Sequence, residues 1–591
     1  MKIQNIKIHN WRSIKDIDLT FEDTMIFIGQ NNHGKSNILS AILFFLGQIG
    51  LDPLDFNENS TELFIEIIFR DLDENDKVTF KKYVTSDNTL RVRKQAQKDL
   101  SFEYHGYVEI PQLEWLREDL ISQFTKREIA EGLPLAPFLP ANGRISPEAF
   151  REAQIKYIES NRTQLQFTYG LEAGPFLGAK NVAKGIFGDV YFLPSIKRAS
   201  DELSVKGNSM FGDLYARVIN KMSQNNTDFK DAKTKIASVI KSMNKTTEDG
   251  NANPNRPVEL TSFESSLMEE LKDWNTTFDV EVTPPDIDEL FRMGTTVWVN
   301  DGVRTDISRK GQGLQRALIF ALIRSLAKIH KEEHQRADRE AGTPPARQAS
   351  KLAYFILEEP ELYLHPQAQR ALYASLLELS TAENQIMICT HSSSFLNLNK
   401  YKSICIVRKN NLSEGTTVFQ CREDIFDADE LKIFNMTYWM NPDRSELFFA
   451  KKVILVEGPT DKTVIPYIAD QLGIFRYDYT LIDCGTKTIM PTYLQLLNKF
   501  SIPYVVVYDR DHQAGKIPDA IAVADRDSKE IEKFIDSAIG KSVILENDIE
   551  EELGITDTPN KKKPYLSLAY IKSSTFVLQD SLKEKVKAIY A

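Results

Sequence analysis

Cysteine is scarce in this sequence, with 4 residues among 591, and this scarcity argues against a disulfide-stabilised fold. No two of the cysteines have the spacing of a metal site. No apolar run approaches the ~20 residues that a membrane helix requires, and the first residues lack the apolar run of a signal peptide. We therefore expect a cytoplasmic protein with reduced thiols and no membrane contact.

An excess of basic charge is also missing, because 73 Lys and Arg face 84 Asp and Glu. Any contact with nucleic acid must therefore come from local basic patches. Residues 91–98 and 560–572 are such stretches, and each is either a solvated face or a nucleic-acid patch. A hydrophobic share of 42% in a chain of this length is typical of a globular protein with about two to four domains.

A glycine-rich motif stands near the start, where an apolar strand changes into an apolar helix. GQNNHGKS fits G-x-x-x-x-G-K-[ST] in the strand-to-helix context that this motif requires. Its backbone N–H groups would face phosphate, with a lysine on the β/γ-phosphates and a serine on Mg²⁺. The motif predicts ATP bound with Mg²⁺ or Mn²⁺, the alternative being a chance match in a loop. The predicted contacts are Gly29, Asn32, Gly34, Lys35 and Ser36.

A second, acidic strand is predicted far downstream, where the apolar run 352–357 ends in Glu358 and Glu359. Glu358 would support the metal. Glu359 would be the catalytic carboxylate of ATP hydrolysis, which polarises the attacking water. A further strand ends at His391, and a glycine-rich segment, SRKGQGLQR, opens an apolar helix. Taken singly, these last two segments are more typical of a turn and a helix start.

In this order the four segments resemble the ATP-binding-cassette (ABC) ATPases of the SMC and RecF type. The resemblance implies that two ATP molecules lie between two heads, so at least a homodimer is expected. It also implies that Gly311, Gln312, Gly313, Glu358 and His391 contact nucleotide or its metal. Two departures are visible. Glu358 stands where these ATPases carry Asp, and the signature lacks the leucine-serine-glycine-glycine form.

The last part of the chain, from about Glu446, alternates apolar strands with helices and predicts a separate α/β domain with a mainly parallel sheet. Glu457 ends one strand, and Asp461 falls in the first turn of the next helix. Asp509 and Asp511 share one face at the carboxyl end of another strand, where open α/β sheets place ligands. Carboxylates held this close need a cation. The alternative is a solvated turn.

This pattern resembles the TOPRIM fold of topoisomerases, primases and certain nucleases, in which a glutamate and a D-x-D pair hold Mg²⁺. An ABC-type ATPase followed by TOPRIM resembles the OLD (overcoming lysogenization defect) nucleases, which include the Gabija effector nuclease and some retron-associated effectors. The resemblance implies DNA cleavage with two divalent metals (Mg²⁺, Mn²⁺ or Ca²⁺), and a further acid and lysine after the D-x-D pair. The metal ligands expected are Glu457, Asp461, Asp509, Asp511 and Glu550.

The further acid and lysine can be chosen from two short clusters. Glu546, Asp548 and Glu550 form one, and Lys561, Lys562 and Lys563 form the other. We select Glu550 as a metal ligand. Lys563 and Glu457 are the catalytic residues expected in this domain. The alternative is that both clusters are only the charged edge of a helix and a surface loop.

The expected fold class is therefore an α/β ABC-type P-loop ATPase head with a helical insertion, followed by a TOPRIM domain. The expected parts are an ATPase part with the P-loop (1–110), a mainly helical dimerisation insertion with a β segment near 188–196 (111–275), a second ATPase part (276–440) and TOPRIM (446–591).

The expected function is an ATP-regulated, metal-dependent DNA endonuclease in anti-phage defence. A strand-passing, topoisomerase-like enzyme and an ATP-dependent DNA sensor without cleavage remain alternatives. The family resemblance implies a partner such as a helicase, or a reverse transcriptase with its nucleic acid.

Overall fold

The chain divides into two compact units in the computed structural model. One unit comprises Met1–Leu193, Ala341–Glu361 and Pro366–Ala591, and the other comprises Pro194–Glu340 and Leu362–His365. The domain boundaries expected above stay a prediction. The structure describes residues 1–58, 60–85, 87–172, 174–179, 182, 185–195, 209–247, 251–274, 278–280, 297–340, 350–380, 383–409, 411, 413–425, 442–512, 516–555 and 563–591.

An antiparallel sheet begins the first unit. Ile3, Ile6 and Ile8 of its first strand are fully buried. Their uneven spacing is possible because the register shifts between Ile3 and Asn5, which turns Ile3 and Ile6 to one face. The strand order is β2 (Ile14–Thr20), β1 (Lys2–Trp11), β4 (Glu62–Arg70), β5 (Leu90–Gln97), β6 (Phe102–Pro111) and β7 (Phe167–Leu171).

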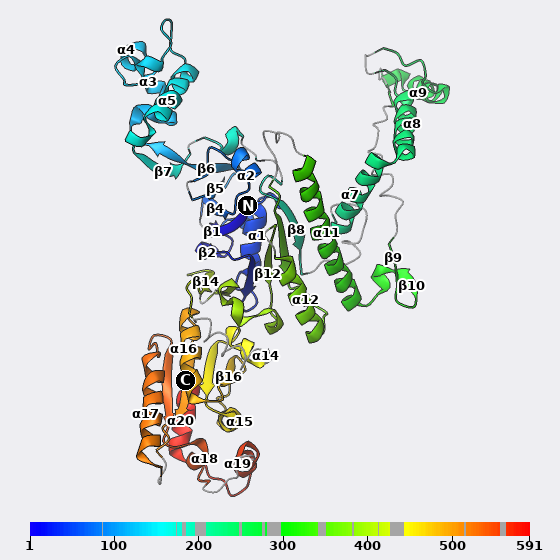
Figure 1. The fold of residues 1–591 in the computed structure, drawn as a ribbon. Coiled ribbons are helices and arrows are strands. Elements are labelled where there is room, and N and C mark those ends of the chain that lie inside the picture. The colour runs from blue at the N-terminus through cyan, green and yellow to red at the C-terminus, as the bar shows by residue number, and fades with distance from the viewer. Residues whose placement is uncertain are drawn as a thin grey trace. The chain divides into compact units, whose positions relative to one another are not determined.

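A second sheet carries the strands predicted to hold nucleotide. Its ladders are parallel except that of the edge strand β14, and α1 (Lys35–Phe45) follows β3 (Figure 1). Buried residues of α1 and of both sheets form one continuous core. The order is β14 (Thr417–Gln420), β13 (Ile404–Arg408), β3 (Thr24–Ile28), β12 (Asn384–Cys389), β11 (Ala353–Glu358) and β8 (Asp189–Leu193), and α12 (Pro366–Leu379) links β11 to β12.

The basic stretch 91–98 is neither a solvated face nor a free basic patch, so both interpretations were wrong. Most of it is strand β5, whose side chains alternate between the two faces of the sheet. Arg91 and Arg93 pair with the buried Glu66 on one face, and Lys94 is buried on the other. The charges of Arg91 and Arg93 are thus paired with an acid of the neighbouring strand β4, and Lys94 is enclosed in the core.

A small helical segment joins β6 to β7. Within the insertion expected to be mainly helical (111–275), Phe167–Leu171 instead form strand β7, which pairs with β6. The helical segment has a small core of its own, which includes Leu116, Phe150 and Ala153. The helices are α3 (Ile121–Phe124), α4 (Arg127–Ala130) and α5 (Pro147–Asn161), and the short α2 (Glu74–Thr79) precedes β5.

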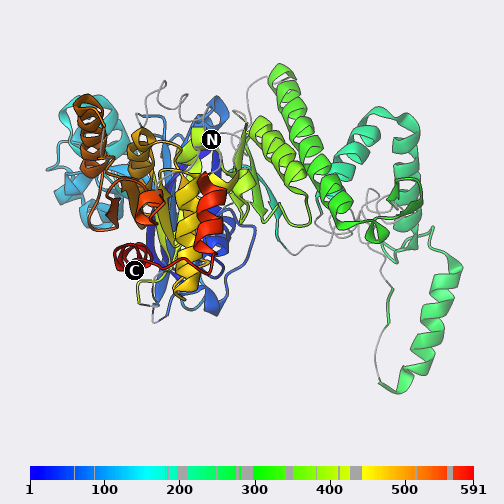
Figure 2. The ribbon, with the colours of Figure 1, turned by 90° about the horizontal axis from the view of Figure 1, so that it is seen from below.

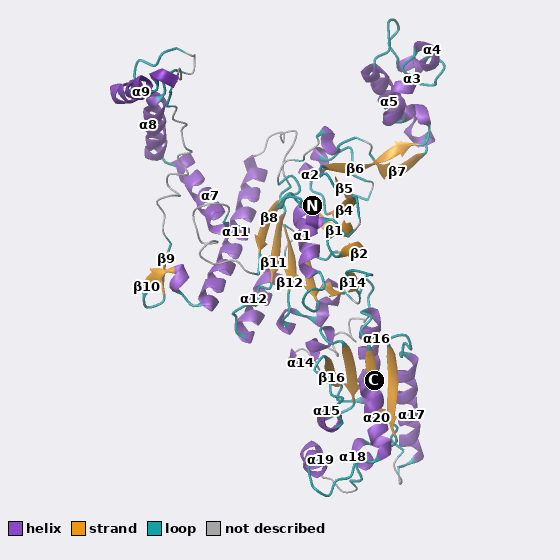
Figure 3. Ribbon diagram, turned by 180° about the vertical axis from the view of Figure 1, so that it is seen from behind, coloured by secondary structure: helices purple, strands orange, loops and turns teal. Residues whose placement is uncertain are grey.

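The second unit is helical apart from one hairpin among its described residues (Figures 2 and 3). The last helix of this unit continues to Glu340, and residues 341–349 lie outside the described residues. The elements are α7 (Met210–Asn225), α8 (Thr227–Met243), α9 (Val258–Glu270), β9 (Trp298–Asn300), β10 (Arg304–Asp306) and α11 (Gln312–Glu340).

The last sheet has four strands, and all its ladders are parallel, as predicted. Both faces of the sheet are buried, which requires helices on both sides (Figure 3). The strand order is β16 (Tyr479–Asp483), β15 (Lys452–Val456), β17 (Tyr504–Asp509) and β18 (Gly540–Leu545). The helices are α14 (Pro442–Ser445), α15 (Pro459–Gln471), α16 (Met490–Lys499), α17 (Pro518–Lys533), α18 (Ile549–Glu552), α19 (Lys563–Ile571) and α20 (Asp580–Tyr590).

None of the described helices is long and apolar enough to cross a membrane.

Candidate metal centre and nucleotide site

The carboxyl ends of β15 and β17 place two acids side by side. Glu457 directly follows β15, and Asp509 is the last residue of β17, which pairs with β15 in parallel. The backbone N–H of Asp509 donates to Oε2 of Glu457 at 3.5 Å. Strand-end placement, read from the sequence, therefore brings these two residues together as predicted.

Asp461 joins the same edge from the first turn of α15. Its Oδ2 accepts the backbone N–H of Gly458 at 3.0 Å, which caps the helix that starts at Pro459. Asp461 is 6% exposed, so its carboxyl is held inside the protein rather than in solvent. The predicted position is confirmed.

Burial and neighbouring acids raise the pKa of all three carboxyls. Burial, followed by the charges of Asp461 and Glu457, raises the pKa of Asp509 to about 9. Burial, with Glu457 and Glu550 beside it, raises the pKa of Asp461 to about 7. Burial and the charge of Asp511 also raise the pKa of Glu457. Like charges in a buried site disfavour their own ionisation unless a cation is present.

One oxygen of this cluster has no partner. Oδ1 of Asp509 is buried and accepts no hydrogen bond from any described residue. An orphaned buried carboxylate oxygen fits a metal ligand, since such an atom otherwise carries the full penalty of desolvation. Among the described residues no group of three or more His, Cys, Asp or Glu is already arranged around a common metal position. The acids therefore converge without forming a finished ligand shell.

Asp511 reaches this edge by a route that differs from the prediction. It was predicted to share the face of Asp509 by strand alternation, but β17 ends at Asp509 and Asp511 has a left-handed φ of 64°. A turn, not the strand, orients its side chain. Lys516 donates to its Oδ1 at 2.9 Å, and Nζ of Lys487 lies 3.9 Å from its Oδ2.

Glu550 and Lys563 are brought together, from α18 and the start of α19. Nζ of Lys563 lies 3.6 Å from Oε1 of Glu550 and 3.7 Å from Oδ2 of Asp548. Glu550 is buried, whereas the side chain of Glu546 is 69% exposed and pairs with Arg510. The geometry therefore favours Glu550 over Glu546. Lys561 and Lys562 lie outside the described residues.

The P-loop has the tight backbone that its glycines predict. Gly29 has φ +148°, and a Cβ there would lie 2.1 Å from the carbonyl oxygen of Val407. Gly34 has φ +103°, and a Cβ would lie 2.3 Å from Oγ1 of Thr416. Lys35 is buried and donates to the carbonyls of Gly29 and Gln30 at 2.9 and 3.0 Å. Asn32 and Ser36 are exposed.

The acidic strand places its second glutamate near that lysine. Glu358 ends β11, and Glu359 follows with a left-handed φ of 45°. Nε2 of His391 lies 3.7 Å from Oε1 of Glu359. Burial lowers the pKa of Lys35, an effect that the neighbouring carboxylates of Glu359 and Glu361 oppose. Lys35, Glu359 and His391 are thus brought together.

Sequence reasoning missed one acid of this site. Glu361 is 8% exposed, and its Oε1 accepts the backbone N–H of His391 at 2.7 Å. Its Oε2 is buried without a hydrogen-bond partner among the described residues. The sequence offered one signal for it, because Glu361 is a third acid that follows Pro360, two residues after Glu359.

The signature residues open a helix, as predicted. Gly311 precedes α11, Gln312 is its first residue, and Gly313 follows. They belong to the second unit, so their place at an ATP site stays a prediction.

Comparison with known families agrees with these two sites. Residues 1–396 match the family described as AAA ATPase domain. Residues 448–511 match the family described as overcoming lysogenization defect protein-like, TOPRIM domain. The second match contains Glu457, Asp461, Asp509 and Asp511, and it ends before Glu550.

Three characterised relatives are similar to this chain. The Old nuclease of Escherichia phage P2 is 23% identical over 479 residues, which cover 79% of this chain and 69% of that protein. Endonuclease GajA of Bacillus cereus (strain VD045) is 21% identical over 524 residues, covering 87% and 76%. The OLD nuclease of Thermus scotoductus is 33% identical over 165 residues, covering 27% and 31%.

The predicted fold class, a P-loop ATPase followed by a TOPRIM domain, is confirmed by these matches together with the sheet topology. This chain belongs to the OLD nuclease family, in which an AAA ATPase domain is joined to an OLD-like TOPRIM domain.

Proposed function

We propose that this protein is an ATP-regulated, divalent-metal-dependent DNA endonuclease with a role in anti-phage defence. The observation that carries the proposal is the buried oxygen of Asp509, which has no hydrogen-bond partner among the described residues, in a carboxyl whose burial and neighbouring acids raise its pKa to about 9. A structural carboxylate would be paired. The names of the relatives, Old nuclease and Endonuclease GajA, support DNA as the substrate.

Five residues would hold two divalent metals in this proposal: Glu457, Asp461, Asp509, Asp511 and Glu550. Bound metals supply an activated water and stabilise the leaving oxygen of a phosphodiester. Lys563, which lies 3.6 Å from Glu550, brings a positive charge to offset charge that develops on the phosphate. Glu457, at the end of β15, adds its negative charge beside Asp509 of β17 and Asp461 of α15.

ATP would act at the other site. Lys35 binds the β/γ-phosphates, Ser36 binds the nucleotide's Mg²⁺ or Mn²⁺ with Glu358, and Glu359 orients the attacking water. His391, which lies 3.7 Å from Glu359, would contact the γ-phosphate. Gly311, Gln312 and Gly313 would complete the site of a second copy, so the active form is at least a homodimer. A helicase, or a reverse transcriptase with its nucleic acid, is the kind of partner we propose for the defence role.

A plasmid-cleavage assay tests the nuclease. Supercoiled DNA is incubated with the full chain in Mg²⁺, in Mn²⁺ and in excess chelator. We expect nicked and linear products with either metal and none with chelator. Relaxed, covalently closed circles would instead indicate strand passage. Unchanged DNA under every metal and nucleotide condition would leave an ATP-dependent DNA sensor and contradict the proposal.

A further inference from the structure

Lys487 is a buried lysine beside the candidate metal centre that the mechanism above does not use. Its side chain is 6% exposed, and it begins the short 3₁₀ helix Lys487–Ile489 after β16. Lysine is almost never this buried unless a partner holds its charge. Its position therefore needs a physical reason.

The partners of Lys487 lie on a strand that is not its neighbour. The sheet order is β16-β15-β17, so the loop after β16 passes the end of β15 to reach the end of β17. There Nζ of Lys487 donates to the main-chain carbonyl oxygen of Asp509 and lies 3.9 Å from Oδ2 of Asp511. Nζ also lies 5.3 Å from the ring centroid of Tyr508, a favourable cation–π distance.

These contacts span the turn that orients Asp511. Residue 511 has φ 64°, a left-handed conformation that is unfavourable for a non-glycine residue and persists where its surroundings enforce it. Lys487 holds the backbone at the start of this turn and the carboxylate at its end. The backbone N–H of Arg510, between them, donates to the carbonyl of Leu545 at 2.8 Å. The turn is thus tied down from both sides.

We propose that Lys487 is a positioning residue for the metal centre: it fixes the Asp509–Asp511 turn so that both carboxylates face one metal position, and it thereby sets the affinity for divalent cations. The proposal rests on the proposed function, since it assumes that these acids bind metal. The metal and the DNA do not need to touch Lys487.

Lys516 offers a matched control, because it contacts the same carboxylate without holding the turn. It donates to Oδ1 of Asp511 at 2.9 Å, but its side chain is 35% exposed. Such partly exposed ion pairs contribute little to stability, because solvent screens them. Neutralising Lys516 removes the same charge from the acidic cluster and leaves the Lys487 contacts in place.

Charge and geometry predict opposite signs for the Lys487 variant. Removing a positive charge beside several carboxylates makes the site more negative, which by itself strengthens cation binding. Releasing the turn lets Asp511 leave the metal position, which weakens binding. The direction of the change therefore separates a positioning role from simple charge balance.

The first test measures Mn²⁺ binding to the full chain by titration calorimetry, without nucleotide, with Asp509→Ala as the background for the other metal sites. We expect Lys487→Met to weaken the Asp509-dependent binding by about 10-fold or more, the usual effect of losing a residue that orients a metal ligand. Lys516→Met should change it by less than about 3-fold. Unchanged or tighter binding in Lys487→Met, or an equal loss in Lys516→Met, overturns the proposal.

A second measurement guards against simple misfolding of the variant. DNA cleavage is followed against Mg²⁺ concentration, with ATP hydrolysis as a check on the rest of the chain. We expect Lys487→Met to need more Mg²⁺ for half-maximal rate and to recover most of the rate at saturating Mg²⁺. A rate lowered equally at every Mg²⁺ concentration contradicts the proposal. If the wild-type chain shows no Asp509-dependent Mn²⁺ binding, the proposed metal centre itself fails.

Discussion

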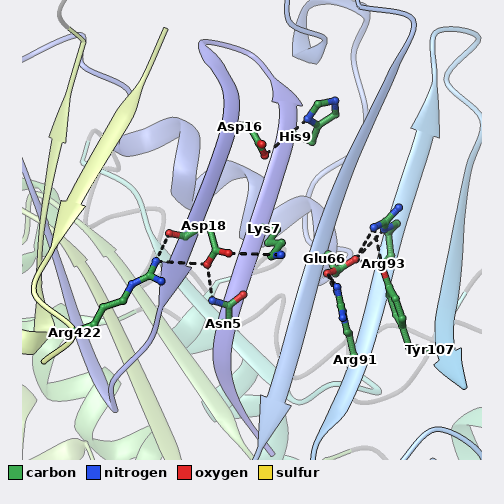
Figure 4. A network of polar contacts seen from close by, with 10 residues as sticks. All are labelled: Asn5, Lys7, His9, Asp16, Asp18, Glu66, Arg91, Arg93, Tyr107 and Arg422. Carbon is green, nitrogen blue, oxygen red and sulfur yellow. Dashed lines mark hydrogen bonds and ion pairs between the residues drawn. The ribbon is translucent and has the colours of Figure 1, made fainter. Parts of the chain in front are cut away.

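Two acids that the fold shields from solvent, Glu66 and Asp509, lie on different sheets and have opposite chemistry. Glu66 of β4 is 1% exposed, and its carboxylate accepts hydrogen bonds from Arg91, Arg93 and Tyr107 (Figure 4). Burial favours a raised pKa for Glu66, but the hydrogen bonds from Tyr107, Arg93 and Arg91 together lower it. Asp509 is half-buried, and its burial together with the charges of Asp461 and Glu457 raises its pKa to about 9.

The difference shows that burial alone does not mark a functional acid. Glu66 has every oxygen paired within the fold and needs nothing from outside. Asp509 retains an oxygen without a partner, so the folded chain leaves its charge for a ligand to stabilise. A pair of basic residues two positions apart, Arg91 and Arg93, belongs to the first case even though it resembles a nucleic-acid patch in the sequence.

Removing the unpaired acid should have the largest effect. We expect Asp509→Ala to lower DNA cleavage by about 10³-fold or more, because a two-metal site cannot lose ligand charge and still hold both metals. ATP hydrolysis should stay near the wild-type rate, since the P-loop lies on another sheet. Cleavage and hydrolysis are measured on the same preparation. Wild-type cleavage by this folded, metal-replete variant would remove the nuclease assignment.

Variants of the ATP site should impair ATP binding or hydrolysis directly, which the Asp509 variant should leave intact. Lys35→Ala should lose ATP binding, because it removes the phosphate contact. Glu359→Gln should bind ATP and hydrolyse it about 10²-fold more slowly, because the amide cannot accept a proton from water. Equilibrium binding and phosphate release distinguish the two variants. Turnover by Glu359→Gln at the wild-type rate would assign the catalytic acid to Glu358 or Glu361.

Weakening the paired acid should affect stability rather than catalysis. Glu66→Gln keeps the shape but removes the charge between Arg91 and Arg93, and we expect a loss of about 1–3 kcal/mol in unfolding free energy. Denaturant unfolding measures the loss, and Asp509-dependent Mn²⁺ binding serves as the control. A variant with wild-type stability and weakened metal binding would contradict the division between the two acids.

Lys94, a buried cation on the same strand as Arg91 and Arg93, completes the comparison, and its variant should give the smallest effect. Lys94 has no acid beside it; Nζ donates to the carbonyl of Phe44 at 2.6 Å and lies within 4.8 Å of three ring centroids. Burial lowers its pKa to about 7 from 10.5. Between pH 7 and pH 10.5 the unfolded chain thus holds a proton that the folded chain lacks, so folding is favoured as pH rises.

Lys94→Met should therefore stabilise the protein more at pH 6 than at pH 9, because the methionine removes a charge that is buried only at the lower pH. The expected gain is about 1 kcal/mol in unfolding free energy, which corresponds to a few degrees in melting temperature. Thermal scans at the two pH values measure it. An equal change at both would show that the three rings and the Phe44 carbonyl keep Lys94 charged throughout.

The sequence predicts the residues whose placement follows from local periodicity. Glu457 and Asp509 end parallel strands, and Asp461 caps the next helix, so strand-end reasoning places all three. Asp511 needed a left-handed turn that alternation does not foresee. Lys487 and Glu361 were missed because their partners, Asp509 and His391, are brought to them only by the tertiary fold.

The same reason explains the misread basic stretch. Glu66 precedes Arg91 by 25 residues, and only the pairing of β4 with β5 joins them. A charge whose partner lies on another strand is invisible to a window of neighbouring residues.

The order of strands in the ATPase sheet also bears on how the protein is made. Strand β3, which leads into the P-loop, pairs with β12 and β13, and these are encoded more than 350 residues later. At about 5–20 residues per second, translation delays these neighbours by roughly 20–70 s. A nascent chain thus carries its phosphate-binding loop on an unfinished sheet, and both neighbouring strands leave the ribosome before the acids of the last sheet. The ATPase sheet can therefore be completed before the acids of the last sheet have been made.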